Sequence, residues 1–258
     1  MSETVLVIPD QHAHPDYNND RADWMGKFIK DLKPDVVVNM GDAADLASLS
    51  TFDKGKASFA ARNYERDIVA HLDFQERMWA PIKRSKRKMP YRVVLEGNHE
   101  YRIKRAMDFS PELAGDRFGL SFKNLDFDRY YHEVVEYDSG TPGIWEYKGV
   151  AFAHYFISGI MGRALSGEHM AASLIKKNFM SSVAAHSHTA DFAIRTDSTG
   201  AHHAGLVVGV YQDYASPWAG LVNKLWWRGA VVLRDFENGM FAPEFVPIER
   251  LRREYHSA

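Results

Sequence analysis

Cysteine is missing from this sequence of 258 residues. Disulfide bonds and metal sites built on thiolates are therefore excluded, and any bound metal must use nitrogen and oxygen ligands. The lack of cysteine also fits a reducing compartment, and the cytoplasm is the location we expect.

A strong excess of charge of either sign is lacking too, since 32 Lys and Arg stand against 34 Asp and Glu, for a formal net charge of −2. The chain as a whole therefore gives no electrostatic indication of nucleic acid or of an anionic membrane. No apolar run approaches the ~18 residues that a membrane span needs, and the N-terminus lacks a signal-peptide pattern. The length suits one large domain, which we expect to cover residues 1–258.

The first hundred residues alternate between strand and helix patterns. Short apolar runs at 5–8, 35–40 and 92–96 indicate buried strands, and the segments between them have helical spacing. One helix is expected to end at Leu32, before Lys33-Pro34, and a long one is expected within 57–79. Strands that alternate with helices in this way predict a parallel sheet with right-handed crossovers.

The rest of the chain is richer in strand patterns. Residues 101–140 have little periodicity beyond a helix start at Ser110-Pro111-Glu112, and we expect insertions at roughly 43–90 and 101–140. A helix is predicted at 163–177. Strands are predicted at 144–147, 150–154, 182–185, 190–196, 206–211, 230–233 and 241–246.

Polar clusters follow five of these strands. The first three clusters are Asp10-Gln11-His12, residues 41–45 (GDAAD) and residues 97–100 (GNHE). Ligands bind beyond the carboxyl ends of the strands in an open parallel sheet, so these loops should lie side by side. Two later strands end in histidine, and the full candidate set is Asp10, His12, Asp42, Asn98, His154, His186 and His188. Such a set exceeds what one tetrahedral ion needs and suits two ions that share a bridging carboxylate.

The order D-x-H, G-D-x-x-D, G-N-H-E, H, H-x-H runs from Asp10 to His188 and resembles the calcineurin-like metallophosphoesterases. The resemblance implies an α/β sandwich in which two mixed β-sheets are flanked by helices, with helical insertions. Two positions depart from the family pattern: Ala185 and Tyr155 stand where glycine is usual.

The resemblance also implies a role for each residue of the set. Asp10, His12 and His188 would hold the first metal, Asn98, His154 and His186 the second, and Asp42 would bridge the two. His99 would face the substrate and either protonate the leaving oxygen or stabilise phosphoryl charge. Asp45 and Glu100 are expected to orient imidazoles, and Arg102 and His14 are candidates for substrate contacts.

Two cations at such a site would neutralise a phosphoester and supply a bridging hydroxide for in-line attack. Four imidazoles argue against Mg²⁺ or Ca²⁺. We expect Mn²⁺ on the basis of the resemblance, with Zn²⁺ or iron as alternatives. The predicted function is that of a binuclear-metal-dependent phosphohydrolase, a phosphodiesterase or phosphatase.

Two other functions stay open, namely a Mn²⁺-dependent nuclease of the same fold and a catalytically silent metal-binding or nucleotide-binding module. A basic run at 83–88 (KRSKRK) could grip a nucleic-acid backbone, although cations at a helix end are commonly just solvated. Five late aromatic residues could stack bases, but such residues more often form a core or a homodimer interface. They are Tyr211, Tyr214, Trp218, Trp226 and Trp227.

Overall fold

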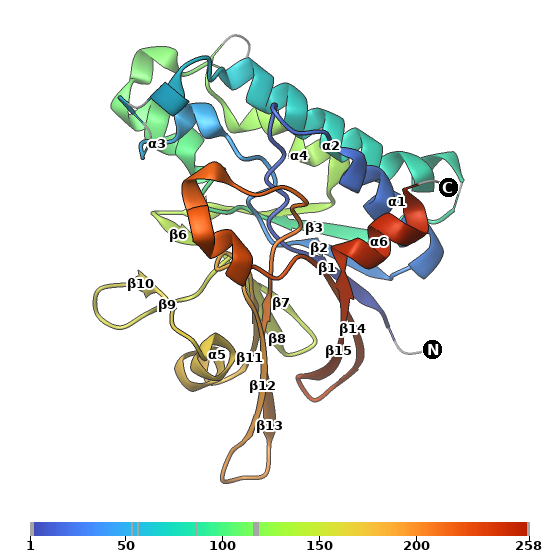
Figure 1. Cartoon of the computed structure of the whole chain (residues 1–258). Helices are drawn as coiled ribbons and strands as arrows, with labels where there is room; N and C mark the ends of the chain where they lie inside the picture. Colours follow the sequence, from blue (N-terminus) through green and yellow to red (C-terminus); the bar gives the residue numbers. More distant parts are fainter. Residues whose placement is uncertain (1–2, 53, 56, 86, 116–118, 257–258) are drawn as a thin grey trace.

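Two β-sheets packed face to face form the centre of the protein (Figure 1). The computed structural model describes residues 3–52, 54–55, 57–85, 87–115 and 119–256. Helices cover the outer face of each sheet, which gives the layered α/β sandwich that the sequence predicts.

The first sheet has six strands in the order β15-β14-β1-β2-β3-β4. Its strands β1 to β4 are parallel, whereas β14 and β15 are antiparallel to their neighbours. The predicted parallel sheet is therefore confirmed, with two strands from the end of the chain added at one edge. The bounds are β1 (Val5–Ile8), β2 (Val36–Asn39), β3 (Tyr91–Leu95), β4 (Glu133–Val135), β14 (Gly229–Glu237) and β15 (Met240–Pro247).

The second sheet has five strands in the order β12-β13-β11-β8-β7. Strands β8, β11 and β13 are parallel, and β7 and β12 run against them at the two edges. The bounds are β7 (Trp145–Tyr147), β8 (Val150–Ala153), β11 (Ser181–Ala184), β12 (Ala190–Thr196) and β13 (His202–Val208). Two short hairpins complete the strands: β5 (Tyr137–Asp138) with β6 (Thr141–Pro142), and β9 (Ile157–Ser158) with β10 (Arg163–Ala164).

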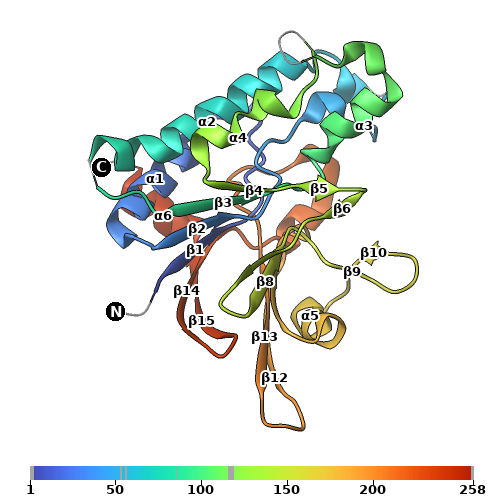
Figure 2. The same cartoon turned by 180° about the vertical axis from the view of Figure 1, so that it is seen from behind.

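The alternation of side chains along β1 explains how the layers pack. Val5 and Val7 belong to the apolar core between the two sheets, whereas Leu6 and Ile8 belong to the core beneath the helices. Both faces of this sheet are thereby removed from water, which is the main stabilising contribution. The covering helices are α1 (Asp20–Leu32), α2 (Tyr64–Arg84), α4 (Phe127–Tyr130) and α6 (Ile248–Tyr255), and α5 (Met170–Asn178) covers the second sheet (Figure 2).

Several predicted boundaries were wrong. Residues 163–164 form β10, so the helix predicted at 163–177 begins only at Met170. The long helix expected from residue 57 begins at Tyr64, because the Asn63 side chain caps it by accepting the N–H of Arg66 at 3.1 Å. The helix start at Ser110-Pro111 yields only a three-residue 3₁₀ turn.

Three helices escaped prediction, among them the four-residue helix α4. The helix α3 (Tyr101–Phe109) begins directly after residues 97–100 and buries only Ile103, which leaves no periodic pattern to recognise. The short helix α6 buries only Ile248 and Leu251. Five 3₁₀ segments complete the described elements: η1 (Ala47–Leu49), η2 (Ala57–Phe59), η3 (Pro111–Leu113), η4 (Phe122–Leu125) and η5 (Pro217–Leu225).

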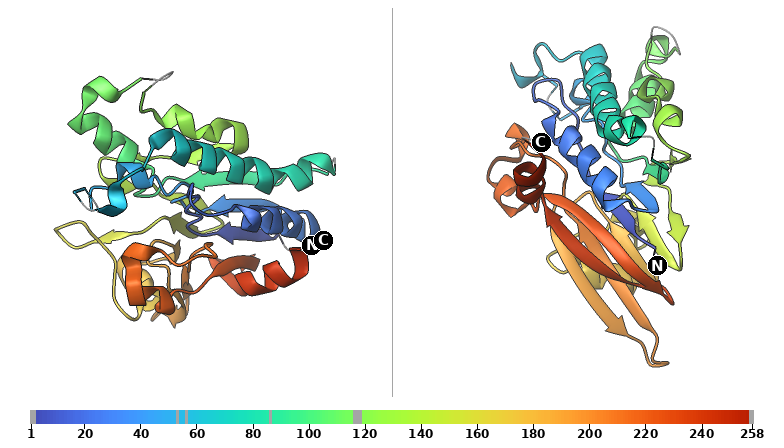
Figure 3. Two further views of the ribbon diagram at one scale, coloured as in Figure 1. Left: turned by 45° about the horizontal axis from the view of Figure 1, so that its top comes forward. Right: turned by 90° about the vertical axis from the view of Figure 1, so that its right-hand side faces the viewer.

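The two edges of the sandwich differ in what they carry. Both termini lie at one edge, and α3, the β9–β10 hairpin and the orange segment that contains η5 lie at the opposite edge (Figure 3). That second edge is where the parallel strands of the first sheet end. Within the described chain, no helix has the length and apolar character that crossing a membrane requires.

Candidate metal centre

The seven predicted ligands meet beyond the carboxyl ends of β1, β2, β3, β8 and β11. Three groups have ligand atoms that all lie within 4.8 Å of one another: Asp10 with His12 and His188, Asp42 with His154 and His186, and His12 with Asp42 and His99. Asn98 joins the second group, since its Oδ1 lies 3.0 Å from His154 Nε2. The structure thus brings together residues up to 178 positions apart in the sequence.

Two glycines allow the ligand loops to approach this closely. A Cβ on Gly97 would lie 2.2 Å from Oδ1 of Asp42, and one on Gly41 would lie 2.7 Å from the backbone nitrogen of Gly97. Gly41 also has a φ of +94°, which favours glycine. The loops after β2 and β3 could not pack side by side with larger residues at these positions.

Four of the predicted ligands have left-handed backbone conformations. The φ values are +44° for His12, +49° for Asp42, +64° for His186 and +61° for His188. Such conformations are uncommon for residues with a side chain and cost roughly 1 kcal/mol or more each. Their concentration in the ligand loops indicates that surrounding contacts hold these loops against local preference.

Arg21 supplies much of that support and was missed by the sequence analysis. Its fully buried guanidinium donates to the carbonyl oxygens of Gln11 at 2.9 Å, His12 at 3.3 Å and Tyr211 at 3.3 Å. Tyr214 Oη donates to the His12 carbonyl as well, at 2.7 Å. An arginine inside an amphipathic helix looks like an ordinary solvated residue in the sequence, so only its burial reveals this role.

Glu100 acts on the backbone of the loops and not on an imidazole, which corrects the expectation from the sequence. Its carboxylate accepts N–H bonds from Gly97 at 2.8 Å, Asp42 at 2.9 Å and Ala44 at 3.2 Å. Burial raises its pKa, and the nearby Asp42 charge adds to that effect. Glu100 therefore ties the loops after β2 and β3 together.

The two buried carboxylates of the centre stay ionised. Burial by itself raises the pKa of Asp10, but the neighbouring His188 and His154 lower it below its usual value. Burial likewise opposes ionisation of Asp42, yet the charges of His154 and His99 hold its pKa well below the ordinary range. Two carboxylates with depressed pKa values, close together inside the protein, favour positive charge between them.

The pKa values of three histidines in the centre are shifted by their surroundings. Burial and the neighbouring His99 lower the pKa of His12 to about 3, and burial and His154 lower that of His186 to about 4. Burial also acts against a charge on His154, but Asp42 outweighs it and raises the His154 pKa to about 10. Nδ1 of His154 donates to the Met40 carbonyl at 2.8 Å, so that its Nε2 faces the centre.

The arrangement fits a pair of divalent cations. Asp10 Oδ2 is buried and makes no hydrogen bond of good geometry within the described part of the chain, although His188 Nε2 lies 3.0 Å away. The Nε2 atoms of His12 and His188 face each other at 3.2 Å. Nitrogen and oxygen lone pairs converge here with few hydrogen-bond donors among them. Mn²⁺, Zn²⁺ and iron prefer a set of ligand atoms of this kind.

His99 lies between Asp45 and Arg102 at the side of the centre. Its Nδ1 donates to the Asp45 carbonyl at 2.7 Å and lies 3.2 Å from Asp45 Oδ1. Arg102 Nη2 lies 2.7 Å from His99 Nε2, and Arg102 Nη1 donates to the Asp45 carbonyl at 2.9 Å. His14 is more distant, with its Nε2 3.9 Å from Asp45 Oδ2.

The late aromatic residues do not form one cluster. Tyr211 is fully buried and Trp227 packs on Phe245, so these two belong to the interior. Trp226 instead stands edge-on to His188, with 4.3 Å between ring centroids, and Trp218 lies next to it. Trp226 and Trp218 therefore extend from His188, and Tyr214 contacts the backbone of His12.

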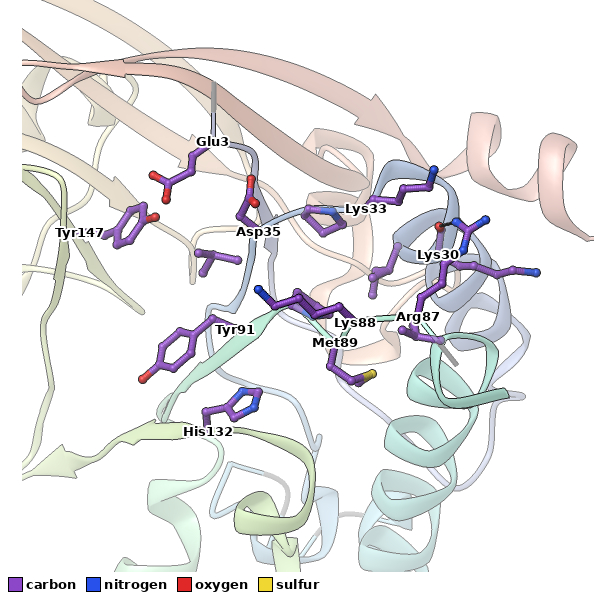
Figure 4. Close-up of a pocket in the computed structure, with 15 residues that line it drawn as sticks. Glu3, Lys30, Lys33, Asp35, Arg87, Lys88, Met89, Tyr91, His132 and Tyr147 are labelled. Atoms are coloured by element: carbon purple, nitrogen blue, oxygen red, sulfur yellow. Dashed lines mark hydrogen bonds between the residues drawn. The ribbon is translucent and has the colours of Figure 1, made fainter. Parts of the chain in front are cut away.

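The basic run lies elsewhere. Arg87 and Lys88 line a pocket of about 920 Å³ together with Lys30, Lys33 and the stacked pair Tyr91 and His132 (Figure 4). This pocket contains the amino-terminal ends of β2 and β3, and none of the predicted site residues lines it. Arg87 and Lys88 are thus separate from the candidate centre, at the other edge of the sheet, and Lys86 of the basic run lies outside the described residues.

This chain belongs to the calcineurin-like phosphoesterase family, whose model matches residues 3–238. The family implies metal-dependent hydrolysis of phosphoesters, and the chain's Asp and His groups are candidate ligands for the metals. The resemblance seen in the sequence motifs is therefore confirmed.

Individual relatives add less. The chain is 32% identical over 146 residues to the Gene 54 protein of Mycobacterium phage D29, and 32% identical over 147 residues to the Gene 54 protein of Mycobacterium phage L5. Each alignment covers 55% of this chain and 55% of the relative, so the chain matches about half the length of these curated relatives. A crystal structure of TT1561 of Thermus thermophilus aligns with 95% of this chain and 99% of its own at 12% identity and a TM-score of 0.37, and the family assignment does not depend on it.

Proposed function

We propose that this protein is a binuclear-metal-dependent phosphohydrolase acting on phosphodiesters or phosphomonoesters. The observation that carries the proposal is the pair of ligand groups on either side of Asp42, one containing Asp10 and the other His154. Two cations, when bound there, would neutralise the phosphate and activate a water molecule as nucleophile. Mn²⁺ is the metal we propose, since nitrogen-rich sites disfavour Mg²⁺.

The residues are assigned the roles that the family resemblance implies. In this proposal Asp10, His12 and His188 hold one ion, Asn98, His154 and His186 hold the other, and Asp42 bridges both. Asp10, His12, Asp42, His154 and His188 are buried, which strengthens their attraction for cations. Glu100 and Arg21 keep the loops in place through the backbone bonds described above.

Two further side chains act on the substrate in this proposal. His99 protonates the leaving oxygen, since an alkoxide leaves poorly without a proton. Arg102 neutralises anionic oxygens of the phosphoryl group, for which its planar guanidinium is suited. Their contact with Asp45 fixes the orientation of both side chains at the edge of the centre.

Metal content and hydrolysis together test the proposal. The wild-type protein loaded with Mn²⁺ should hold two ions per chain and hydrolyse a chromogenic diester or monoester. Asp10→Asn should lower the metal content to about one ion, and Asp42→Asn should lower it further, because the Asp42 carboxylate lies within reach of both His12 and His154. Asp191→Asn is a matched control, because that carboxylate instead accepts the backbone N–H of Ala171.

Some results would contradict this function. Two bound ions without hydrolysis of a diester, a monoester or DNA would favour the catalytically silent module. Hydrolysis confined to single- or double-stranded DNA would favour the nuclease. A wild-type protein that binds one ion, with no further loss in Asp42→Asn, would contradict the bridging role.

A further inference from the structure

An indole pair at the rim of the candidate centre is the feature that the proposed chemistry leaves unused. Trp226 stands perpendicular to the His188 ring, at 88° and 4.3 Å between centroids. The ring centroid of Trp218 lies 5.7 Å from that of Trp226, so Trp226 connects Trp218 to the predicted metal ligand His188. The pair begins at the centre and extends outward.

The outer indole is exposed to an unusual degree. Trp218 has 66% of its surface accessible, and Leu221 and Leu225 on the same segment have 78% and 72%. A large aromatic side chain loses favourable burial when it faces water in this way. Trp218 lies on η5, and the orange segment that contains η5 is at the edge where the ligand loops end (Figure 3).

The segment that carries Trp218 is held by hydrogen bonds. Asn223 accepts the Ser216 N–H at 2.9 Å and donates to the carbonyls of Ser216 at 2.8 Å and Gly220 at 2.9 Å. Gln212 Nε2 donates to Ser216 Oγ at 2.9 Å. The indole is therefore presented on a braced turn, which lowers the entropy that a ligand must remove on binding.

The same segment is also tied to the ligand loop itself. The N–H of Trp227 donates to the carbonyl of His188 at 2.9 Å, and the Arg228 guanidinium lies 5.6 Å from the Trp226 ring centroid. The distance between the indoles and the centre is consequently set by backbone contacts. A substrate would meet both features at a fixed spacing.

We infer that Trp218, backed by Trp226, is a stacking platform for a nucleobase, and that the substrate is a phosphoester of a nucleoside. This inference rests on the proposed function. Nucleotides carry a flat ring within a few bonds of a phosphate. An indole face stacks on such a ring whichever base it belongs to. The source of the nucleoside, a small ester or the end of a single strand, shares this chemistry.

A pair of substrates with one leaving group tests the inference. Thymidine 5′-(p-nitrophenyl phosphate) and methyl p-nitrophenyl phosphate both release p-nitrophenolate and differ only in the nucleoside. The Mn²⁺-loaded wild-type protein should prefer the thymidine ester in kcat/KM, and Trp218→Ala should lower that preference roughly tenfold, since stacking contributes ~1–3 kcal/mol per base. Trp218→Phe should keep most of the preference, because the aromatic face is retained.

Phe179→Ala is the matched control, since Phe179 is also a highly exposed aromatic residue, at 84%, and lies at the C-terminal cap of α5. It should leave the preference unchanged. A single-stranded oligothymidylate then distinguishes the sources: its hydrolysis with the same dependence on Trp218 assigns a strand end, and its resistance assigns small esters. Either result supports the nucleoside.

Other results overturn the inference and leave the proposed function intact. Equal hydrolysis of both esters by the wild-type protein would show that the nucleobase is not recognised. An equal loss for both esters in Trp218→Ala would show a structural role. A dimer in sedimentation velocity that Trp218→Ala converts to monomer, or flotation with phosphatidylglycerol vesicles that the substitution abolishes, would assign the indole to another occupant. If neither ester is hydrolysed, it is the proposed function that fails.

Discussion

Arg102 Nη2 lies 2.7 Å from His99 Nε2, on the side of the imidazole that faces the candidate centre. The other ring nitrogen, Nδ1, donates to the Asp45 carbonyl, so in this arrangement Nε2 accepts a hydrogen from the guanidinium. If His99 is the proton donor that we propose, Arg102 must leave Nε2 when a substrate arrives, and Nε2 must take up a proton before it can give one to the leaving oxygen. The guanidinium is then available to the phosphate.

This contact predicts different losses for the two residues. His99→Ala should keep both metals and reduce turnover of an alkyl phosphoester about 10²–10⁴-fold, with a much smaller loss for a p-nitrophenyl ester, whose leaving group needs no proton. Arg102→Gln should lower kcat/KM for both esters alike, because it acts on phosphate charge. Metal analysis and the two rates check this, and an alkyl-ester rate in His99→Ala equal to that of the wild type would rule out the proton donor.

We expect the substitution Gly97→Ala, which adds a single methyl group, to disrupt the metal centre. The new Cβ of Gly97→Ala would lie 2.2 Å from Asp42 Oδ1 and 2.6 Å from the Asp42 backbone nitrogen, so the loops must separate. We expect lower metal content and activity in a folded protein, measured by metal analysis and circular dichroism. In Gly115→Ala the nearest atom among the described residues is 3.7 Å away, so this control should behave as the wild type does.

Because of His71, we expect the free energy of unfolding to fall in mild acid. His71 is fully buried in α2, its Nε2 donates to the Leu125 carbonyl at 3.0 Å, and burial lowers its pKa to about 4 from an ordinary value of 6.5. Between these two values the unfolded chain binds a proton that the folded chain does not, so stability decreases as the pH falls through this window. The full effect is about 3 kcal/mol.

Urea midpoints of the metal-free protein between pH 4 and 7.5 measure this effect. His71→Gln removes the titrating group, so its stability should depend less on pH than that of the wild type, and the two curves should converge as the pH falls. The exposed His169 offers a control, as His169→Gln should keep the wild-type slope. A wild-type slope in His71→Gln would show that His71 is not responsible.

The family, the order of strands and helices in the first hundred residues and the set of residues that meet at the centre could be predicted from the sequence. This was possible because strand ends, glycines and histidines at fixed spacing leave local signals, as residues 97–100 do after β3. Helices with little buried apolar surface leave weak signals, which explains why α3 and α6 were missed. The helix predicted at 163–177 begins only at Met170, and Arg163 and Ala164 instead pair with β9.

The amino-acid sequence by itself determined which side chains could hold metals, since the absence of cysteine and the ordered Asp, Asn and His residues restrict the ligands to nitrogen and oxygen. Only the tertiary structure decided which backbone groups hold those ligands in place. The bond from the buried Arg21 to Tyr211, the N–H bonds from Asp42 and Ala44 to Glu100, and the position of Trp226 against His188 all join segments that are distant in the chain. Contacts of that kind depend on packing across the sheets, which no local pattern encodes.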